Sequence, residues 1–270
     1  MTPIPVLDPD DPRIAAFRDV KERDLTGRQG LFVAEGEVVL RVLASEASRS
    51  APVAVLIAEK RLEGLRQVLE RLPQHVPVHV APQAVLNAVA GFDLHRGILA
   101  LGRKPEPVDA GALLDGLPER AVVVAACGIG NHDNIGGLFR NAAAFGAGAV
   151  LLDRTCCDPF YRKAIRVSVG AVLRTPMATG LTAEAMVDLL QGREFDVLAL
   201  TPSAEQTLAE LQAGRRTAVL LGSEGPGLPR EIIARCRPVG IRMAGGFDSL
   251  NVAATSAVAL HHLTTTASEG

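Results

Sequence analysis

The sequence predicts an α/β fold arranged as two domains. Short apolar runs rich in valine, isoleucine and leucine alternate with segments whose apolar residues recur every three or four positions, which is typical of strands separated by helices. The alternation stops at residues 103–107, where two prolines stand among charged residues, and starts again at Ala121. We therefore expect a small N-terminal α/β domain over residues 1–105 and a second domain over residues 106–270.

The first domain begins with a predicted surface helix over residues 10–24, because Ile14, Phe17 and Val20 recur at helical spacing among charges. Apolar runs then predict strands over residues 31–35, 52–58, 76–81 and 97–102. Between them, helical periodicity predicts helices over residues 37–44, 61–72 and 83–90.

The second domain repeats this alternation with longer apolar runs. Strands are predicted over residues 121–126, 149–153, 195–200, 217–222 and 239–243. Helices are predicted over residues 135–146 and 182–191, around Leu208, and from residue 251 onward. Strands separated by helices indicate a mostly parallel sheet with helices on both faces and ligand-binding loops at the carboxyl ends of the strands.

Composition excludes several classes of protein. No apolar run approaches the ~20 residues that cross a bilayer, and the N-terminal MTPIPVLDPDDP lacks the pattern of a secretory signal, so we expect a cytoplasmic protein. The four cysteines, Cys127, Cys156, Cys157 and Cys236, show no CxxC or zinc-finger spacing, so we expect reduced thiols and no metal site. The formal net charge of −2 argues against a uniformly basic surface.

Positive charge gathers locally in two clusters. One comprises Arg13, Arg18, Lys21, Arg23 and Arg28, and the other comprises Arg154, Arg162, Lys163, Arg166 and Arg174. The second has fewer opposing carboxylates and is the better candidate for binding phosphate. Either cluster is equally compatible with an ordinary solvated face.

Two glycine-rich loops near the C-terminus follow predicted strands. The first is LLGSEGPGLP from Leu220, and the second, IRMAGGFDSLNVAA, leads through Ser249 and Asn251 into an Ala/Val-rich helix. Glycines let a backbone approach a ligand closely, and the free amides at a helix start carry partial positive charge. The two loops therefore suggest one shared pocket, although each loop taken alone is more simply interpreted as a connecting turn with a capping residue.

Three separated motifs together carry a family resemblance. Asn134, Gly136 and Arg140 form NxGxxxR; Gly222, Glu224, Gly225, Gly227 and Leu228 form GxEGxGL; and Ser249, Leu250 and Asn251 form SLN. In this order and spacing, residues 121–265 resemble the SpoU (TrmH) family of SPOUT-class RNA 2′-O-ribose methyltransferases. The N-terminal segment GRQGLFVAEGE is similar to the ribosomal-protein-like domain with which several members hold RNA.

The resemblance implies a C-terminal trefoil knot, S-adenosylmethionine as cofactor, a homodimer without a metal, and RNA as substrate, ribosomal RNA more than transfer RNA. Arg140, from its own or the partner subunit, would contact the ribose hydroxyl or a phosphate, Asn134, Ser249 and Asn251 would orient hydroxyl and cofactor, and Glu224 would order its loop or contact the nucleotide. The implied cofactor site comprises Leu221, Gly222, Ser223, Gly225, Gly227, Ile241, Met243, Ser249, Leu250 and Asn251. The candidate RNA-binding residues are Arg13, Lys21, Arg28, Arg154, Arg162, Lys163 and Arg166.

Some features depart from the family pattern or favour other interpretations. Ala253 and Ala254 stand where many relatives have a serine, and Ser223 stands where relatives often have asparagine. His132 is placed to shuttle a proton, but a solvent-exposed loop histidine is the simpler interpretation. The alternatives are a non-catalytic RNA-binding paralogue, a tRNA 2′-O-methyltransferase, or a dinucleotide-binding oxidoreductase, and the last is disfavoured because GxGxxG does not follow the strand at 121–126.

Overall fold

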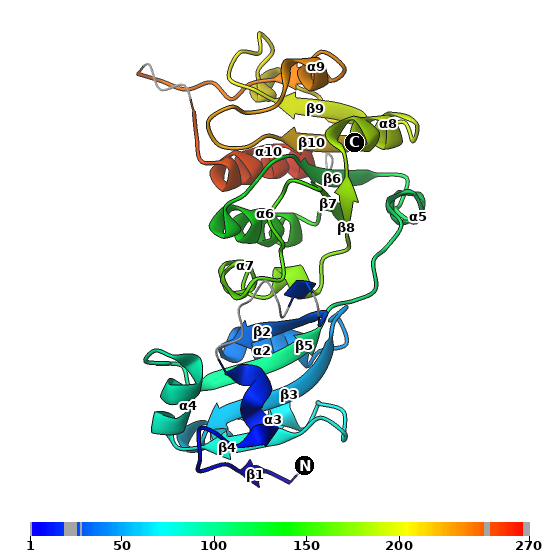
Figure 1. Cartoon of the computed structure of the whole chain (residues 1–270). Helices are drawn as coiled ribbons and strands as arrows, with labels where there is room; N and C mark the ends of the chain where they lie inside the picture. The colour runs from blue at the N-terminus through cyan, green and yellow to red at the C-terminus, as the bar shows by residue number, and fades with distance from the viewer. Residues whose placement is uncertain (1, 19–25, 28, 246–248, 267–270) are drawn as a thin grey trace. The chain divides into compact units, whose positions relative to one another are not determined.

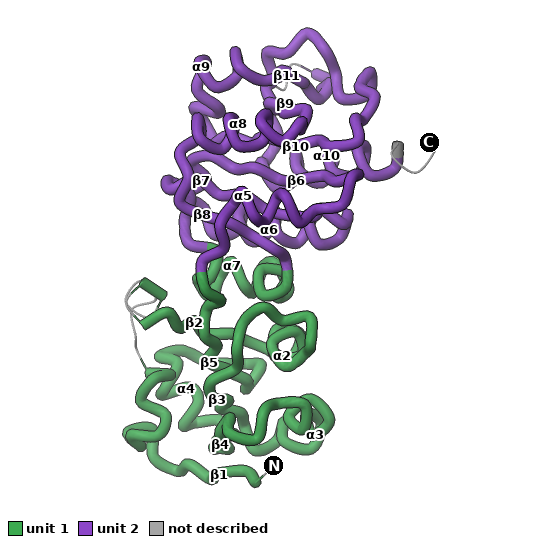
Figure 2. Tube along the Cα trace, turned by 90° about the vertical axis from the view of Figure 1, so that its right-hand side faces the viewer, with its two compact units in different colours: residues 1–106, 159–174 green, residues 107–158, 175–270 purple. Residues whose placement is uncertain are grey.

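The structure is a computed structural model that describes residues 2–18, 26–27, 29–245 and 249–266. The chain forms two compact units, one of Met1–Glu106 with Pro159–Arg174 and one of Pro107–Asp158 with Thr175–Gly270 (Figure 2). The division at Glu106 lies beside the boundary expected at residues 105–106. Segment Pro159–Arg174, expected within the second domain, instead groups with the first unit.

The first unit is built on a five-stranded mixed sheet with strand order β1-β4-β3-β5-β2. Its strands are β1 (Ile4–Pro5), β2 (Leu31–Glu35), β3 (Ala51–Ala58), β4 (Val78–Ala81) and β5 (Ile98–Arg103). Strands β1, β4 and β3 are parallel, and β5 runs antiparallel to both β3 and β2. The carboxyl ends of β2, β3 and β4 therefore lie at the same edge of the sheet as the start of β5.

Helices cover the first unit's sheet where the periodicity predicts them. They are α2 (Glu37–Leu43), η2 (Glu59–Arg61), α3 (Leu62–Leu69) and α4 (Gln83–Ala90). The helix expected over residues 10–24 appears, in its described part, as a 3-10 helix, η1 (Pro12–Phe17), that buries Ile14 and Phe17. Asp11 begins this helix by accepting a bond from the Arg13 amide, and Arg18 is already extended, so the described chain leaves the helix after Phe17.

Residues 159–174 join the first unit through aromatic and helical packing. The ring of Phe160 lies 5.3 Å from that of Phe32 on β2, and helix α7 (Arg162–Val167) packs against the same strand. The short η3 (Ala171–Leu173) follows, and the Leu173 carbonyl accepts a hydrogen bond from the Arg49 amide. Contacts made by the folded chain, which local sequence patterns do not encode, assign this segment to the first unit.

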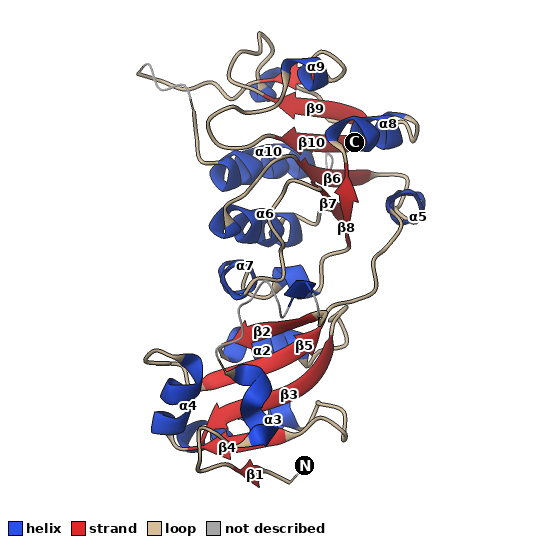
Figure 3. Ribbon diagram, in the orientation of Figure 1, coloured by secondary structure: helices blue, strands red, loops and turns tan. Residues whose placement is uncertain are grey.

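The second unit is an α/β domain with a parallel sheet, as predicted. The sheet has six strands in the order β11-β9-β10-β6-β7-β8, of which β8 was not predicted. Its strands are β6 (Ala121–Ala126), β7 (Ala149–Asp153), β8 (Met177–Leu181), β9 (Asp196–Leu200), β10 (Arg216–Leu221) and β11 (Arg237–Val239). Helices α5 (Ala110–Asp115), α8 (Ala183–Gln191) and α9 (Arg230–Ile233) pack on one face of the sheet. Helices α6 (His132–Ala144) and α10 (Val252–Thr266) lie side by side on the other (Figures 1 and 3).

Two predicted boundaries in the second unit are wrong by a few residues. The strand expected over residues 239–243 ends at Val239, because the Gly240 amide and carbonyl bond Gln206 and Leu208, which draw the chain off the sheet. Helix α6 begins at His132, because the Asn131 side chain caps it by accepting from the Asp133 amide at 2.8 Å. Asn134 is therefore a buried residue inside the first turn and does not cap the helix.

Helices α6 and α10 cross at very short range. A Cβ atom built on Gly137 would lie 2.5 Å from the Cβ of Ala253. Beside this contact, Asn141 Nδ2 donates to the Ala253 carbonyl at 2.7 Å and to Ser256 Oγ at 2.9 Å. Ala253, noted above as a departure from the family pattern, is therefore a packing residue of this crossing. None of the helices in the described part of the chain has the length and apolar character that a membrane span requires.

Candidate active site and cofactor pocket

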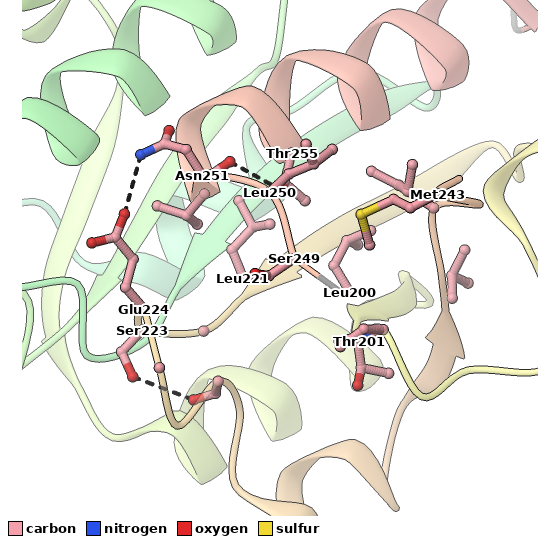
Figure 4. A pocket seen from close by; sticks show the side chains of 17 residues that line it. Leu200, Thr201, Leu221, Ser223, Glu224, Met243, Ser249, Leu250, Asn251 and Thr255 are labelled. Carbon is pink, nitrogen blue, oxygen red and sulfur yellow. Dashed lines mark hydrogen bonds between the residues drawn. The ribbon is translucent and has the colours of Figure 1, made fainter. Parts of the chain in front are cut away.

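A cavity of about 400 Å³ lies at the carboxyl ends of β9, β10 and β11, beside the start of α10 (Figure 4). Pockets of this size are typical of small-molecule sites, and the edge of a parallel sheet is where α/β domains place them. All the residues expected to bind cofactor line it: Leu221, Gly222, Ser223, Gly225, Gly227, Ile241, Met243, Ser249, Leu250 and Asn251. The motifs therefore predicted most of the residues that line this cavity.

The remaining lining residues were not expected. They are Leu200, Thr201, Pro202, Glu224, Val239, Val252 and Thr255, of which Glu224 alone had been assigned a role, in catalysis. Leu200 to Pro202 follow β9, which pairs with β10 in the sheet. Strand order would have indicated this loop, but the motifs lie only on its neighbours.

The loop after β10 is tight because two of its backbone segments touch. A Cβ atom on Gly222 would lie 2.4 Å from the carbonyl carbon of Gly227 and from the amide nitrogen of Leu228. The Gly227 amide donates to the Ser223 carbonyl at 3.1 Å, which closes the turn. Only glycine fits at position 222 with this loop shape. The loop thereby presents main-chain groups, in place of a side chain at residue 222, to the cavity.

Side chains from all three motifs meet beside the cavity. Asn134 Nδ2 donates to Glu224 Oε1 at 2.7 Å, Asn251 Nδ2 donates to Asn134 Oδ1 at 2.8 Å, and Asn251 Nδ2 lies 3.1 Å from Glu224 Oε1. Asn134 is 3% exposed, whereas Glu224 and Asn251 are exposed and line the cavity. Figure 4 shows Asn251 directed at Glu224. The motifs, which lie far apart in sequence, thus form one connected polar group.

Helix capping determines how this group is oriented. Asn251 Oδ1 accepts from the Ala253 and Ala254 amides at 2.9 and 3.2 Å, so Asn251 caps α10 as expected. Because its oxygen faces the helix, its NH2 group faces Asn134 and Glu224. Asn134 accepts that bond through its own oxygen, so its NH2 group also faces Glu224. One carboxylate oxygen is held by two donors, and the other is left for a ligand.

A buried aspartate supports the neighbouring loops. Asp153, at the end of β7, accepts from the amides of Gly128, Thr155 and Cys156 at 2.9–3.1 Å and from the Thr155 hydroxyl. The Cβ position of Gly128 lies 3.4 Å from the Cβ of Ser223. Asp153 therefore holds the loop after β6 against the glycine loop after β10.

Of the other two expected catalytic residues, Ser249 lies at the cavity and Arg140 does not line it. Ser249 lines the cavity from the segment before α10. Arg140 is exposed on α6, six residues beyond Asn134, which is about 9 Å along a helix and about 120° around its axis. It makes no hydrogen bond or ion pair within the described part of the chain. In the described part of the chain, Arg140 therefore makes no hydrogen bond to Asn134, Glu224 or Asn251.

His132 and the cysteines differ in their environments. His132 is half-buried in the first turn of α6, so the expectation of a solvent-exposed loop histidine is wrong. Burial raises the pKa of the Cys156 thiol to about 12 and that of Cys157 to about 11, so both are protonated at neutral pH. All four cysteines are free, and no group of three His, Cys, Asp or Glu side chains among the described residues is arranged to hold a metal ion.

The candidate RNA-binding residues are divided between the two units. Arg154 is exposed in the second unit, whereas Arg162, Lys163 and Arg166 lie on α7 in the first. Arg162 is partly engaged, with Nε 3.8 Å from Glu35 Oε2 and its guanidinium 4.8 Å from the centre of the Phe92 ring. In the first cluster, Arg13 is paired with Asp11, while Lys21 and Arg28 lie outside the described residues.

A parallel α/β domain with an apolar cavity at the strand ends, and with amide and carboxylate side chains at its rim, has the architecture of a small-molecule-dependent enzyme. Comparison with known proteins shows to which enzyme family the chain belongs. The family model of the SpoU rRNA methylase family matches residues 121–261. The chain belongs to this family and is an RNA methyltransferase of the SpoU type.

Individual relatives extend the similarity over nearly the whole chain. A Mycobacterium tuberculosis protein named as an uncharacterized tRNA/rRNA methyltransferase is 38% identical over 96% of this chain and 91% of its own length. A crystal structure of an RNA 2′-O ribose methyltransferase is 26% identical, with a TM-score of 0.79 over 98% of this chain and 99% of that one. An rRNA methyltransferase from Sinorhizobium meliloti, solved with S-adenosylmethionine bound, shares the fold at 21% identity, with a TM-score of 0.80 over 97% and 98%.

Proposed function

We propose that this chain transfers a methyl group from S-adenosylmethionine to a ribose 2′-hydroxyl of RNA, with ribosomal RNA as the preferred substrate class. The observation that carries the proposal is the hydrogen-bonded group of Asn134, Glu224 and Asn251 at the rim of a cavity of about 400 Å³. The name of the matched family and the two solved relatives, one a 2′-O enzyme and one with bound S-adenosylmethionine, support it.

The cavity suits S-adenosylmethionine chemically. Leu221, Ile241, Met243 and Leu250 provide apolar walls for an adenine ring and the methylene groups. The loop from Gly222 to Gly227 presents backbone donors and acceptors, and Thr201, Ser249 and Thr255 supply hydroxyl groups. When bound, this cofactor supplies a methyl group already activated by its attachment to a sulfonium.

The side chains of Asn134, Glu224 and Asn251 would then orient the ribose 2′-hydroxyl that accepts the methyl group. One carboxylate oxygen of Glu224 is available to accept a hydrogen bond from the ribose hydroxyl. Asn134 and Asn251 donate to the other oxygen and so fix the orientation of the carboxylate. A carboxylate in this position acts as a general base: it accepts the hydroxyl proton and so increases the nucleophilicity of the ribose oxygen. Alignment of the reacting atoms supplies the rest of the rate enhancement.

We also propose that the active enzyme is a homodimer in which Arg140 of one subunit acts in the site of the other. Arg140 is exposed and makes no hydrogen bond or ion pair with the described residues of its own chain, so its guanidinium is available to a second chain. A guanidinium is a poor base but a good clamp for phosphate, so it would hold the nucleotide whose ribose is methylated. We likewise propose that the second unit contains the C-terminal trefoil knot that the family resemblance implies.

The experiment that tests this function locates the transferred methyl group. The purified chain is incubated with methyl-labelled S-adenosylmethionine and, separately, unmodified ribosomal RNA and transfer RNA, and the labelled RNA is then hydrolysed in alkali. Alkaline cleavage needs a free 2′-hydroxyl, so a ribose methyl group leaves the label in an alkali-resistant dinucleotide. We expect that product from ribosomal RNA. Label released in mononucleotides would mean base methylation, and preferential labelling of transfer RNA would contradict the substrate class.

A further inference from the structure

The described residues that line the cavity include several with side-chain hydroxyl groups. They are Thr201, Ser223, Ser249 and Thr255. Two of them are engaged by their own turns: Thr201 Oγ1 accepts from the Ser203 amide at 3.4 Å and lies 3.0 Å from the Ser203 hydroxyl, and Ser223 Oγ donates to the Gly227 carbonyl at 3.4 Å. Thr255 differs from both, because it lies within helix α10 and not in a turn.

The proton of the Thr255 hydroxyl is bound to the helix backbone. Thr255 Oγ1 donates to the Asn251 carbonyl at 3.1 Å, and the Thr255 amide donates to the same carbonyl at 2.9 Å (Figure 4). Threonines in helices commonly make this bond to the carbonyl four residues earlier. A hydroxyl has one proton to donate and two lone pairs that accept. With its proton used in this way, Thr255 offers the cavity a hydrogen-bond acceptor and no donor.

The acceptor positions of Thr255 are not used within the protein. No described residue donates a hydrogen bond to Thr255 Oγ1, and the residue is half-buried at the cavity. Ala253, where many relatives have a serine, does not line the cavity, because its Cβ lies against Gly137 on α6. The hydroxyl that α10 presents to the cavity in this chain is therefore that of Thr255.

An acceptor in this place suits a ligand that carries N–H groups. Glu224 is the one charged side chain among the described residues that line the cavity, and it too accepts hydrogen bonds. Burying an N–H group of a ligand without an acceptor costs free energy, so each acceptor in the cavity favours ligands that donate to it.

We propose that Thr255 Oγ1 accepts a hydrogen bond from an N–H group of S-adenosylmethionine and so contributes to selection of this cofactor. The cofactor has two groups of this chemistry, the amino group of its adenine and the ammonium group of its methionine part. The inference rests on the proposed function, because it takes the occupant of the cavity to be S-adenosylmethionine. The competing explanation is a structural one, in which Thr255 only bonds its own helix.

The test is titration calorimetry of the full chain with S-adenosylmethionine. Valine has nearly the shape of threonine but no hydroxyl, so Thr255→Val leaves the N–H group of the ligand unpaired. We expect this variant to bind about tenfold more weakly than the native chain. Thr255→Ser keeps the hydroxyl and should keep the native affinity.

Thr264→Val is the matched control. Thr264 Oγ1 donates to the Leu260 carbonyl at 2.8 Å, which is the same bond on the same helix, but Thr264 does not line the cavity. The two valine variants should therefore change thermal unfolding alike, whereas only Thr255→Val should weaken binding. If that variant does not fold, as judged by circular dichroism, Thr255→Ala replaces it with a residue that favours helices, and the same loss is expected.

A second ligand identifies which group donates. 5′-Methylthioadenosine has the adenine of the cofactor and lacks its amino-acid part. If Thr255→Val weakens binding of both ligands, the adenine amino group is the donor. If it weakens only S-adenosylmethionine, the donor is the ammonium group.

Three results would overturn the inference. They are native affinity in Thr255→Val, an equal loss of affinity in Thr264→Val, and a loss in Thr255→Ser as large as that in Thr255→Val. Each of these, combined with tight binding and methyl transfer by the native chain, would leave the proposed function intact. Absence of S-adenosylmethionine binding by the native chain would instead reject the proposed function, and the role of Thr255 with it.

Discussion

The Asn251 side chain both caps α10 and bonds Asn134 and Glu224, and substitutions can separate these two roles. Its oxygen caps α10, and its NH2 group orients Asn134 and Glu224. We expect Asn251→Asp to preserve the cap, since aspartate caps as well as asparagine, and to place a second carboxylate against Glu224. Thermal unfolding should change little, while methyl transfer should fall by on the order of 10²-fold, because the acceptor is misaligned.

The matched comparison is Asn251→Ala, which removes both interactions. This variant should additionally lose about 1 kcal/mol of stability from the missing cap. If Asn251→Asp transferred methyl groups at the native rate, the connected polar group would have no part in catalysis.

His79 gives the first unit a dependence on pH. It lies on β4 with 3% of its surface exposed, and burial lowers its pKa below the ordinary value of 6.5, with the Arg13 charge acting in the same direction. In the unfolded chain the ring binds a proton at higher pH than in the folded chain. Stability is therefore complete above about pH 6.5 and decreases as the pH falls below it, until the folded form is also protonated.

Chemical denaturation between pH 7.5 and 5 measures this effect. We expect the native chain to lose stability steadily over that range and His79→Asn to show a weaker dependence. Asp11, whose pKa is lowered to about 2 by its hydrogen bonds to Arg13, acts only at more acidic pH and does not interfere. Parallel curves for the two proteins would refute the assignment.

At the scale of elements, the crossing of α6 and α10 supports the site. Helix α6 carries Asn134, and helix α10 begins directly after Asn251. Gly137 lets α6 approach Ala253 on α10 closely. Gly137→Val would force the helices apart, and we expect a loss of about 1–3 kcal/mol, measured by denaturant unfolding. The control is Gly130→Val, since a Cβ atom there meets nothing within 4 Å. Equal stability of the two variants would show that the crossing adapts without cost.

The sequence predicted most of the strands and long helices, because apolar periodicity responds directly to burial, but it missed β8, in which only Ala178 is buried. Boundaries were missed where a few hydrogen bonds decide them. Asn131 begins α6 three residues before the expected start, and both Asn131 and Asn134 have the chemistry of a cap. The end of β11 depends on hydrogen bonds from Gly240 to residues 206 and 208, which no local pattern reveals.

At the scale of the whole molecule, the site is a product of strand order. Strand β10 lies between β9 and β6, so the loops that follow these strands meet at one edge. The motifs placed residues on the loop after β10, the start of α6 and the start of α10, and those residues do converge. Thr201 and Pro202 were missed because nothing in their own sequence marks them, and a motif does not specify that Arg140 is exposed on α6.

We propose that the loops meeting at this edge hold S-adenosylmethionine, and titration calorimetry measures this binding without requiring the RNA. Leu250 lines the cavity and is 46% exposed, so Leu250→Arg should fill the entrance without disturbing the core. We expect the native chain to bind in the micromolar range, corresponding to about 8 kcal/mol, and the variant to lose at least about 100-fold in affinity. No binding by the native chain, or equal binding by the variant, would contradict it.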